Sequence, residues 1–369
     1  MKISPFKLER FFAGYEFKAP YLLCCSDCES VSVAGLLGLE PGSMDEFEKL
    51  RLGYTESEGS PELRQAIAGL YDTIGADDIL VHAGAEEAIF VFMNAVLKPG
   101  DHVIVHYPCY QSLLEIARSI GCEVTEWPAE EQAEWRLDLN FLERNIRKNT
   151  RLIVLNCPHN PTGYLMGAEE FKSLIGMARK YGIYVFSDEV YRLLEYDERD
   201  RLPAACDLYE NAASLGVMSK SFGLAGLRIG WVATANRGVL HEMAVFKDYT
   251  TICSSAPSEF LSTLALKHGD ALIRRNMEII RSNLKTLDDF FGRYRGMFGW
   301  VRPKAGPIAF PRLKTGRNIE EFCIDLAERQ GVLLLPGNHF GVDTANFRLG
   351  FGRKNLPECL RRLEEYLKQ

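Results

Sequence analysis

The chain has 369 residues, of which 47% are apolar and 25% are charged, an ordinary globular composition. At roughly 100–200 residues per domain, this length predicts two or three domains with enough core to fold without disulfide or metal staples. The 43 basic and 50 acidic residues give a net charge of −7. Because proteins that hold nucleic acid or anionic membranes carry a basic excess, this balance argues against both and favours a small-molecule substrate.

No apolar run approaches the ~20 residues that span a bilayer, and the first ten residues lack the apolar core of a signal peptide. We therefore expect a cytoplasmic protein whose ten cysteines are reduced thiols. Cys24, Cys25 and Cys28 lie close together in the sequence. Three sulfurs without a second pair at finger spacing make a poor zinc site, so we expect no metal.

Helix-like and strand-like segments alternate from about residue 60 to 235. Ser60 and Pro61 open the first helix, because serine caps helices and proline needs no donor in the first turn. Strands are predicted over 79–82, 102–107, 151–155, 183–186, 213–218 and 229–233, and helices over 86–97, 110–120 and 169–181. Several of these strands are continuous apolar runs, which is typical of parallel sheets covered on both faces. We therefore expect an α/β fold with a three-layer α/β/α domain around a mostly parallel sheet.

Beyond residue 255 the pattern changes to a smaller α+β domain, with a long charged helix over 271–294 and another helix over 319–329. Short strands are expected over 332–335 and 347–351, and a capping box at Asn355 and Glu358 opens the last helix. The first forty residues have no strong pattern. We expect an N-terminal segment over 1–45 that joins the small domain, a large domain over 46–250 and a C-terminal small domain over 251–369.

Four polar clusters follow predicted strands, at the sheet edge where open α/β sheets bind ligands. In the first, Gly84, Ala85 and Glu86 open a helix, whose free N–H groups and dipole could seat a phosphate. An ordinary tight turn is the alternative. In the second, Asn160 stands in a rigid turn rich in proline, where its amide could bind a ligand oxygen.

The third cluster places Asp188 at a buried strand end, where a carboxylate needs a cationic partner. That partner could be a ring nitrogen of a ligand or a structural arginine. The fourth places Lys220 directly after an apolar run, between Ser219 and a glycine-rich stretch that ends near Arg228. Burial lowers the pKa of a lysine and favours its nucleophilic amine, which makes Lys220 a candidate nucleophile.

Together these motifs resemble the class I/II branch of the fold-type I aminotransferases, which use pyridoxal 5′-phosphate. The matching positions occur in the family's order and span most of the chain: Tyr54, Gly59, Leu63-Arg64, Gly84-Ala85-Glu86, Asn160-Pro161-Thr162-Gly163, Asp188-Glu189-Val190-Tyr191, Ser219-Lys220, Arg228-Ile229-Gly230 and Arg348. The resemblance implies an aminotransferase that moves an amino group between a small α-amino acid and a 2-oxo acid.

The resemblance also implies roles at the reacting centre. Lys220 would form a Schiff base with the cofactor and shuttle the proton at the substrate Cα, and Asp188 would keep the pyridine nitrogen protonated. Asn160 and Tyr191 would hydrogen-bond the phenolic oxygen of the ring, and Tyr110 would stack on the ring face. Lys220, Asp188 and Tyr191 are therefore the expected catalytic residues.

A phosphate seat and a substrate clamp complete the implied site. The phosphate would lie against Gly84, Ala85, Glu86, Ser219 and Arg228. Arg348 would hold the α-carboxylate with a bidentate fork, beside Asn160. Tyr54 would reach the phosphate of the neighbouring subunit, which implies a homodimer with shared active sites and neither a nucleic-acid nor a membrane partner.

Two departures from the family pattern leave the reaction open. Val217 stands where many relatives have a phosphate-binding serine or threonine, and the N-terminal segment is unlike the usual one. Its Glu16, Asp27 and Glu29 could meet a cationic side chain or form a solvated acidic stretch. The alternative is therefore a lyase, or an oxidase or cyclase of an arginine-like amino acid. A DNA-binding regulator is disfavoured, because only about fifty residues precede Tyr54.

Overall fold

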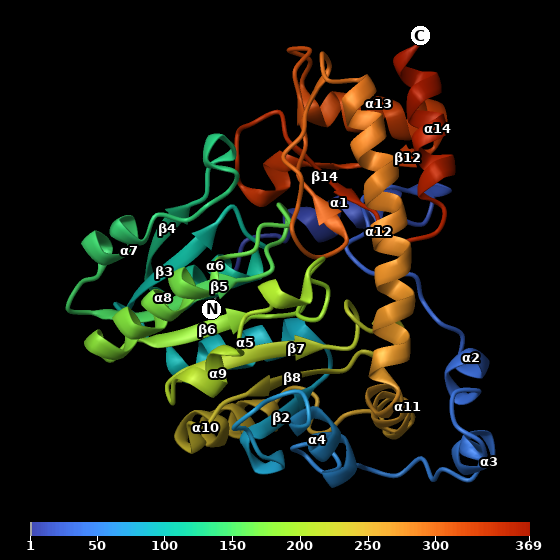
Figure 1. Cartoon of the computed structure of the whole chain (residues 1–369). Coiled ribbons are helices and arrows are strands. Elements are labelled where there is room, and N and C mark those ends of the chain that lie inside the picture. Colours follow the sequence, from blue (N-terminus) through green and yellow to red (C-terminus); the bar gives the residue numbers. More distant parts are fainter. Residues whose placement is uncertain (1) are drawn as a thin grey trace.

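A seven-stranded sheet forms the centre of the computed structural model, which describes residues 2–369 (Figure 1). The strands lie in the order β2-β8-β7-β6-β5-β3-β4. They are β2 (Ile79–His82), β3 (His102–Tyr107), β4 (Glu123–Pro128), β5 (Thr150–Asn156), β6 (Tyr184–Asp188), β7 (Ala212–Val217) and β8 (Gly230–Ala233). Strand β8 runs antiparallel to β2 and β7, and the other neighbours are parallel. The expected α/β fold with a mostly parallel sheet is confirmed.

Helices cover both faces of the sheet, which explains the continuous apolar strands. Leu152 and Val154 of β5 enter one core, and Ile153 and Leu155 enter another, because successive strand residues point to opposite faces. The first face packs against α5 (Ala85–Val96), α6 (Ser112–Ile120) and α10 (Arg237–Lys247). The second face packs against α7 (Leu139–Asn145), α8 (Ala168–Tyr181) and α9 (Ala205–Leu208).

Helix ends follow the sequence signals in one case and depart from them in another. Ser60 Oγ accepts a hydrogen bond from Leu63 N at 3.4 Å and caps α4 (Pro61–Ala68) as predicted. The capping box predicted for α14 (Leu356–Leu367) is wrong, because Asn355 makes no side-chain cap bond. The Glu358 carboxylate instead binds Arg361 and Arg362, whose guanidinium groups lie one turn further along the helix.

The C-terminal part carries short strands and three helices. The 25-residue helix α12 (Gly269–Arg293) runs from the sheet domain into this part (Figure 1). Helices α13 (Ile319–Gln330) and α14 flank the strands there. The strands are β9 (Phe298–Gly299), β10 (Ile308–Ala309), β11 (Arg312–Leu313), β12 (Val332–Leu333), β13 (Leu335–Pro336) and β14 (Phe347–Gly350). Helix α11 (Ala256–Lys267) precedes α12 and packs on α4.

The N-terminal segment is more ordered than its sequence predicts, with α1 (Lys7–Tyr15), β1 (Tyr21–Leu22), α2 (Val33–Leu37) and α3 (Ser43–Glu48). Strand β1 pairs in parallel with β12. Beyond it, Gly350 N donates to Leu23 O at 3.0 Å, and Glu29 N donates to Gly352 O at 2.8 Å. A Cβ atom at Gly350 would lie 1.7 Å from the carbonyl oxygen of Cys25, so only glycine allows this close approach.

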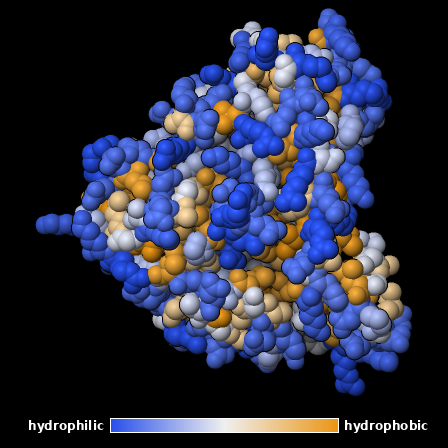
Figure 2. Space-filling model, viewed as in Figure 1, coloured by the Kyte–Doolittle hydropathy of each residue, from blue (hydrophilic) through white to orange (hydrophobic). Residues whose placement is uncertain are grey.

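Hydrophilic residues cover most of the face shown in Figure 2. Hydrophobic residues gather in a band beside the lower half of α12 in the same view. Within residues 2–369, no helix is both long and apolar enough to cross a membrane.

Candidate active site

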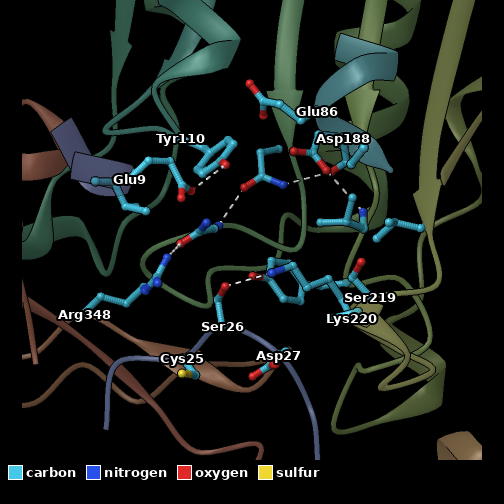
Figure 3. A pocket seen from close by; sticks show the side chains of 18 of the residues that line it. Glu9, Cys25, Ser26, Asp27, Glu86, Tyr110, Asp188, Ser219, Lys220 and Arg348 are labelled. Carbon is cyan, nitrogen blue, oxygen red and sulfur yellow. Dashed lines mark hydrogen bonds between the residues drawn. The ribbon is translucent and has the colours of Figure 1, made fainter. Parts of the chain in front are cut away.

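A cavity of about 340 Å³ opens where β5, β6 and β7 end, and the N-terminal segment and β14 close its other side (Figure 3). Ten of the twelve residues expected to bind cofactor or substrate line it: Ala85, Glu86, Tyr110, Asn160, Asp188, Tyr191, Ser219, Lys220, Arg228 and Arg348. Gly84 and Tyr54 are not among the lining residues. The carboxyl ends of the parallel strands therefore bring together residues that lie far apart in the sequence.

Lys220 follows β7, and its amine lies inside the cavity. Nζ donates a hydrogen bond to Ser26 Oγ at 2.8 Å and lies 5.8 Å from the centre of the Tyr191 ring. Burial lowers the pKa of Lys220, and the Arg348 guanidinium acts in the same direction. Both effects favour the neutral amine, which is the nucleophilic form.

Asp188 is the last residue of β6, and only 5% of its surface is exposed. Its Oδ1 accepts a hydrogen bond from Val190 N at 3.2 Å, while its backbone oxygen accepts one from Asn156 Nδ2 at 3.0 Å. Burial raises the pKa of Asp188 to about 7. Within residues 2–369 no arginine pairs with this carboxylate, so the structural arginine left open by the sequence is absent there. A cationic ligand group would lower this pKa again.

Arg348 lies in β14 and is 2% exposed. Its Nε donates to the carbonyl oxygen of Cys24 at 3.1 Å, and its Nη1 donates to Asn160 Oδ1 at 3.3 Å. No carboxylate in the described part of the chain forms an ion pair with this guanidinium. Since a buried charge without a counter-ion is unfavourable, Arg348 is suited to an anionic ligand.

The start of α5 and the loop after β7 form a cradle for an anion. Gly84 has φ = +89°, and a Cβ atom there would lie 2.6 Å from Arg228 Nη2. Gly84 therefore lets the Arg228 guanidinium approach the N-terminus of α5, although it does not itself line the cavity. Arg228 has φ = +52°, a left-handed conformation that few residues other than glycine adopt. Ala85 and Ser219 line the cavity beside Arg228.

These residues fit pyridoxal 5′-phosphate. The Tyr191 hydroxyl is buried without a hydrogen-bond partner among the described residues, and burial raises its pKa. Among residues 2–369 the buried Asp188 carboxyl forms no ion pair, and the Arg228 guanidinium lies beside Gly84 at the N-terminus of α5. A free phenol, a buried carboxyl and a cationic cradle match the phenolic oxygen, the ring nitrogen and the phosphate of this cofactor.

Tyr110 and Glu86 form the rim of the cavity opposite Ser26 (Figure 3). The Tyr110 ring packs against Phe6 at 5.0 Å between ring centres. Glu86 Oε1 accepts a hydrogen bond from the Ser112 hydroxyl, whereas Oε2 has no partner among residues 2–369. Burial raises the pKa of Glu86. The Glu86 carboxyl is thus held at the helix start, where only its backbone amide was expected to act.

Val217 lines the cavity, where it offers no hydroxyl group to a ligand. Tyr54 is 95% exposed on the surface of the single chain. Its expected reach into a partner's site stays a prediction.

The N-terminal segment supplies a wall that sequence reasoning largely missed. Its lining residues are Leu8, Glu9, Phe12, Glu16, Cys25, Ser26 and Asp27, and Arg353 lies with them. Glu9 Oε1 accepts a hydrogen bond from the Tyr110 hydroxyl at 3.4 Å. Burial and the nearby Glu9 raise the pKa of Glu16. No local pattern marks this wall, because the pairing of β1 with β12 brings it to the sheet edge.

The three acidic residues singled out for a cationic side chain have different surroundings. Glu16 lines the cavity. Asp27 also lines it but forms a bidentate pair with Arg353, at 3.1 and 2.8 Å. Glu29 is not among the lining residues, and its carboxylate accepts a hydrogen bond from Lys354 N at 2.9 Å. Glu9, which the sequence did not single out, lies in the wall in place of Glu29.

Comparison with known proteins agrees with this geometry. The family model for aminotransferase class I and II matches residues 45–363. The chain belongs to this family. The family uses pyridoxal 5′-phosphate, so the fit of the cavity to that cofactor has an independent basis.

Three relatives of this aminotransferase-family protein cover nearly the whole chain. Capreomycidine synthase from Streptomyces vinaceus is 28% identical over 364 residues, which are 98% of this chain and 93% of that protein. The crystal structure of a PLP-dependent aminotransferase from Streptococcus suis has a TM-score of 0.94 and 32% identity, covering 100% of this chain and 98% of that one. The PLP-dependent cyclase OrfR has a TM-score of 0.91 and 27% identity, with the same coverage.

Proposed function

We propose that the protein is a pyridoxal 5′-phosphate-dependent aminotransferase that moves an amino group between a small α-amino acid and a 2-oxo acid. The observation that carries the proposal is that Lys220, Asp188 and Arg348 converge on one cavity. The three residues supply a buried amine whose pKa is lowered, a buried carboxyl and a guanidinium that forms no ion pair among the described residues. An α-amino acid held in such a cavity has its carboxylate, its Cα and the cofactor ring each beside a matching group.

The role of each residue toward the cofactor follows from its position in the cavity. Pyridoxal 5′-phosphate, when bound, withdraws the electron pair of a breaking Cα bond into its ring. Asp188 would hold the proton on the ring nitrogen, and Asn160 and Tyr191 would bind the phenolic oxygen. Ala85, Ser219 and Arg228 would hold the phosphate. Together these residues would orient the cofactor in the cavity.

The substrate is held and deprotonated by two residues. Arg348 binds the α-carboxylate and thereby fixes the position of Cα. With the cofactor bound, Lys220 Nζ would accept the Cα proton and would later give up a proton to complete the transfer. Proton transfer by a positioned group of this kind contributes typically 100- to 10,000-fold to a rate.

The test is a product panel. The purified protein, loaded with pyridoxal 5′-phosphate, is given single α-amino acids with and without a 2-oxo acid, and new amino acid, ammonia and hydrogen peroxide are measured. We expect a new amino acid to form only with the 2-oxo acid present. If no 2-oxo acid accepts the amino group from any donor, the proposal of transamination fails.

A second candidate function keeps the cofactor and changes the outcome to that of a lyase, or of an oxidase or cyclase of an arginine-like amino acid. It is favoured by the acidic wall at Glu9 and Glu16, which would suit a guanidinium. The similarity to a PLP-dependent cyclase over the whole chain supports it further. In the same panel, this candidate predicts ammonia, peroxide or a cyclic product from arginine without any 2-oxo acid.

A homodimer with shared active sites is part of the proposal. Tyr54 is almost fully exposed in the single chain, as are Leu52 and Tyr249, which are 82% and 89% exposed. Contiguous patches of exposed apolar side chains are typical of surfaces that another protein covers, and Leu52 and Tyr54 are close neighbours in the sequence. Sedimentation of the purified protein tests the dimer, and a monomer at micromolar concentration would contradict it.

A further inference from the structure

Three contacts join residues 24–27 of the N-terminal segment to basic residues that line the cavity. The Cys24 carbonyl accepts from Arg348 Nε at 3.1 Å, Ser26 Oγ accepts from Lys220 Nζ at 2.8 Å, and Asp27 pairs with Arg353. The stretch is fixed in turn by its hydrogen bonds along β14. The position of the Ser26 hydroxyl is therefore set by the fold and not by a mobile loop.

From these contacts we propose that Ser26 is a further catalytic residue, which holds the free amine of Lys220 and stabilises its ammonium form during proton transfer. The inference rests on the proposed function, because it concerns the step in which Lys220 acts on the substrate. Ser26 contacts Nζ, which is a reacting atom. The Ser26 hydroxyl lies in the wall formed by the N-terminal segment, whereas Asp188 lies in the wall formed by the strand ends (Figure 3).

The proton balance of this step gives Ser26 its role. When the Cα–H bond breaks, the proton would move to Lys220 Nζ, and the bonding electron pair would stay with the substrate, where the bound cofactor would stabilise it. Nζ then carries a positive charge in a buried site, close to the Arg348 guanidinium. Ser26 Oγ accepts a hydrogen bond from the new ammonium and gives up no proton itself. Hydrogen bonds to charged groups are stronger than neutral ones, so this bond strengthens as the proton arrives.

Other groups face Lys220 and act on its charge. Asp27, Cys25 and Asp188 favour the ammonium, while burial and Arg348 oppose it. Asp27 is already paired with Arg353, so its charge is partly compensated. Among the described residues, Ser26 is the one with an uncharged oxygen within hydrogen-bond distance of Nζ. Removing the Ser26 hydroxyl should therefore destabilise the ammonium form of Lys220 and lower its pKa, without changing the net charge of the cavity.

The test compares Ser26→Ala with Ser26→Thr, which keeps a hydroxyl, and with Ser30→Ala, an exposed serine on the same segment. The first readout uses cofactor-free protein, in which the pH dependence of Lys220 acetylation by acetic anhydride is followed by peptide mass spectrometry. The second is the rate at which the holoenzyme exchanges deuterium from the Cα of a labelled amino acid. Ser26→Gly serves as a second removal variant if Ser26→Ala does not fold.

We expect Ser26→Ala to lower the labelling pKa of Lys220 by about one unit and to slow Cα exchange on the order of 10- to 100-fold. Ser26→Thr should bring both the acid dissociation constant of Lys220 and the rate of Cα exchange to within a few fold of the wild type. Ser30→Ala should match the wild type. The proposal is overturned if Ser26→Ala leaves both the acid dissociation constant of Lys220 and the rate of Cα exchange within twofold of the wild type. If the wild type exchanges no Cα deuterium from any amino acid, the proposed function fails instead, and the acetylation profile still decides the role of Ser26.

Discussion

The two walls of the cavity differ in how the chain builds them. On the sheet side, Asp188 ends a strand and Asn160 and Lys220 follow strands, so the parallel register sets their positions. On the opposite side, Glu16 and Ser26 belong to a segment that reaches the site through the pairing of β1 with β12. The sheet side carries the groups that match the cofactor. The N-terminal side carries the acidic residues Glu9 and Glu16, and its segment is one of the two departures from the family pattern, the other being Val217 on the sheet side.

This difference separates the chemistry from the choice of substrate. A change on the sheet side should abolish reaction with every amino acid, because all of them need the cofactor. A change on the N-terminal side should alter which amino acid reacts, or how fast the proton moves, while the cofactor stays bound. The following variants test this division.

The largest effect is expected for Lys220→Ala on the sheet side. Without the amine, the variant should lose the visible absorbance of the lysine-linked cofactor, and turnover should fall about 100- to 10,000-fold for every substrate. Absorption spectra and turnover measure this, with circular dichroism to confirm that the variant is folded. An unchanged spectrum would rule out Lys220 as the residue that carries the cofactor.

Arg348→Ala should produce the next largest effect, because we propose that this side chain binds the α-carboxylate, which all substrates share. Loss of a desolvated charge pair costs about 2–5 kcal/mol, so KM should rise on the order of 100-fold. Amino acid methyl esters serve as the control, since they lack the carboxylate. The wild type should prefer the acid strongly over the ester, and the variant should not. Equal discrimination in both proteins would mean that another residue holds the carboxylate.

Glu16→Gln should change selectivity on the N-terminal side by about tenfold, lowering kcat/KM for arginine relative to alanine. The matched control is Glu29→Gln, in the same segment but outside the cavity. Competition assays with both amino acids measure the ratio. If both variants keep the wild-type ratio, the N-terminal wall does not select substrates by the charge of their side chain.

The smallest effect concerns Asp188 and pH. In cofactor-free protein its pKa is about 7, far above that of an unfolded aspartate, so the folded state binds the extra proton between about pH 4 and 7. The stability that this proton gives is present at low pH and is lost as the pH rises to 7. Relative to Asp188→Asn, the wild type should therefore gain on the order of 2 °C in Tm from pH 7.5 to 5.5. Thermal unfolding measures this difference, and a pH-independent difference would show that the carboxyl does not titrate between pH 5.5 and 7.5.

The sequence predicted most of the residues on the sheet side of the site, but few of those in the N-terminal wall. Continuous apolar strands followed by Asn160, Asp188 and Lys220 are local signals, and the fold class follows from the same strands. The contact of Ser26 with Lys220 joins residues 194 positions apart and depends on the pairing of two-residue strands, which no periodicity reveals. For the same reason, the sequence singled out Glu29 but not Glu9, since it could not show which acidic residues face inward.

The most direct test of the account is to reduce the resting holoenzyme with sodium borohydride and map the cofactor adduct by peptide mass spectrometry. Reduction makes the link between lysine and cofactor permanent, so the adduct marks the residue that carries pyridoxal 5′-phosphate. We expect a phosphopyridoxyl adduct on Lys220 alone, which is absent from Lys220→Ala and from cofactor-free protein. An adduct on another lysine, or none at saturating cofactor, would contradict the central assignment of the site.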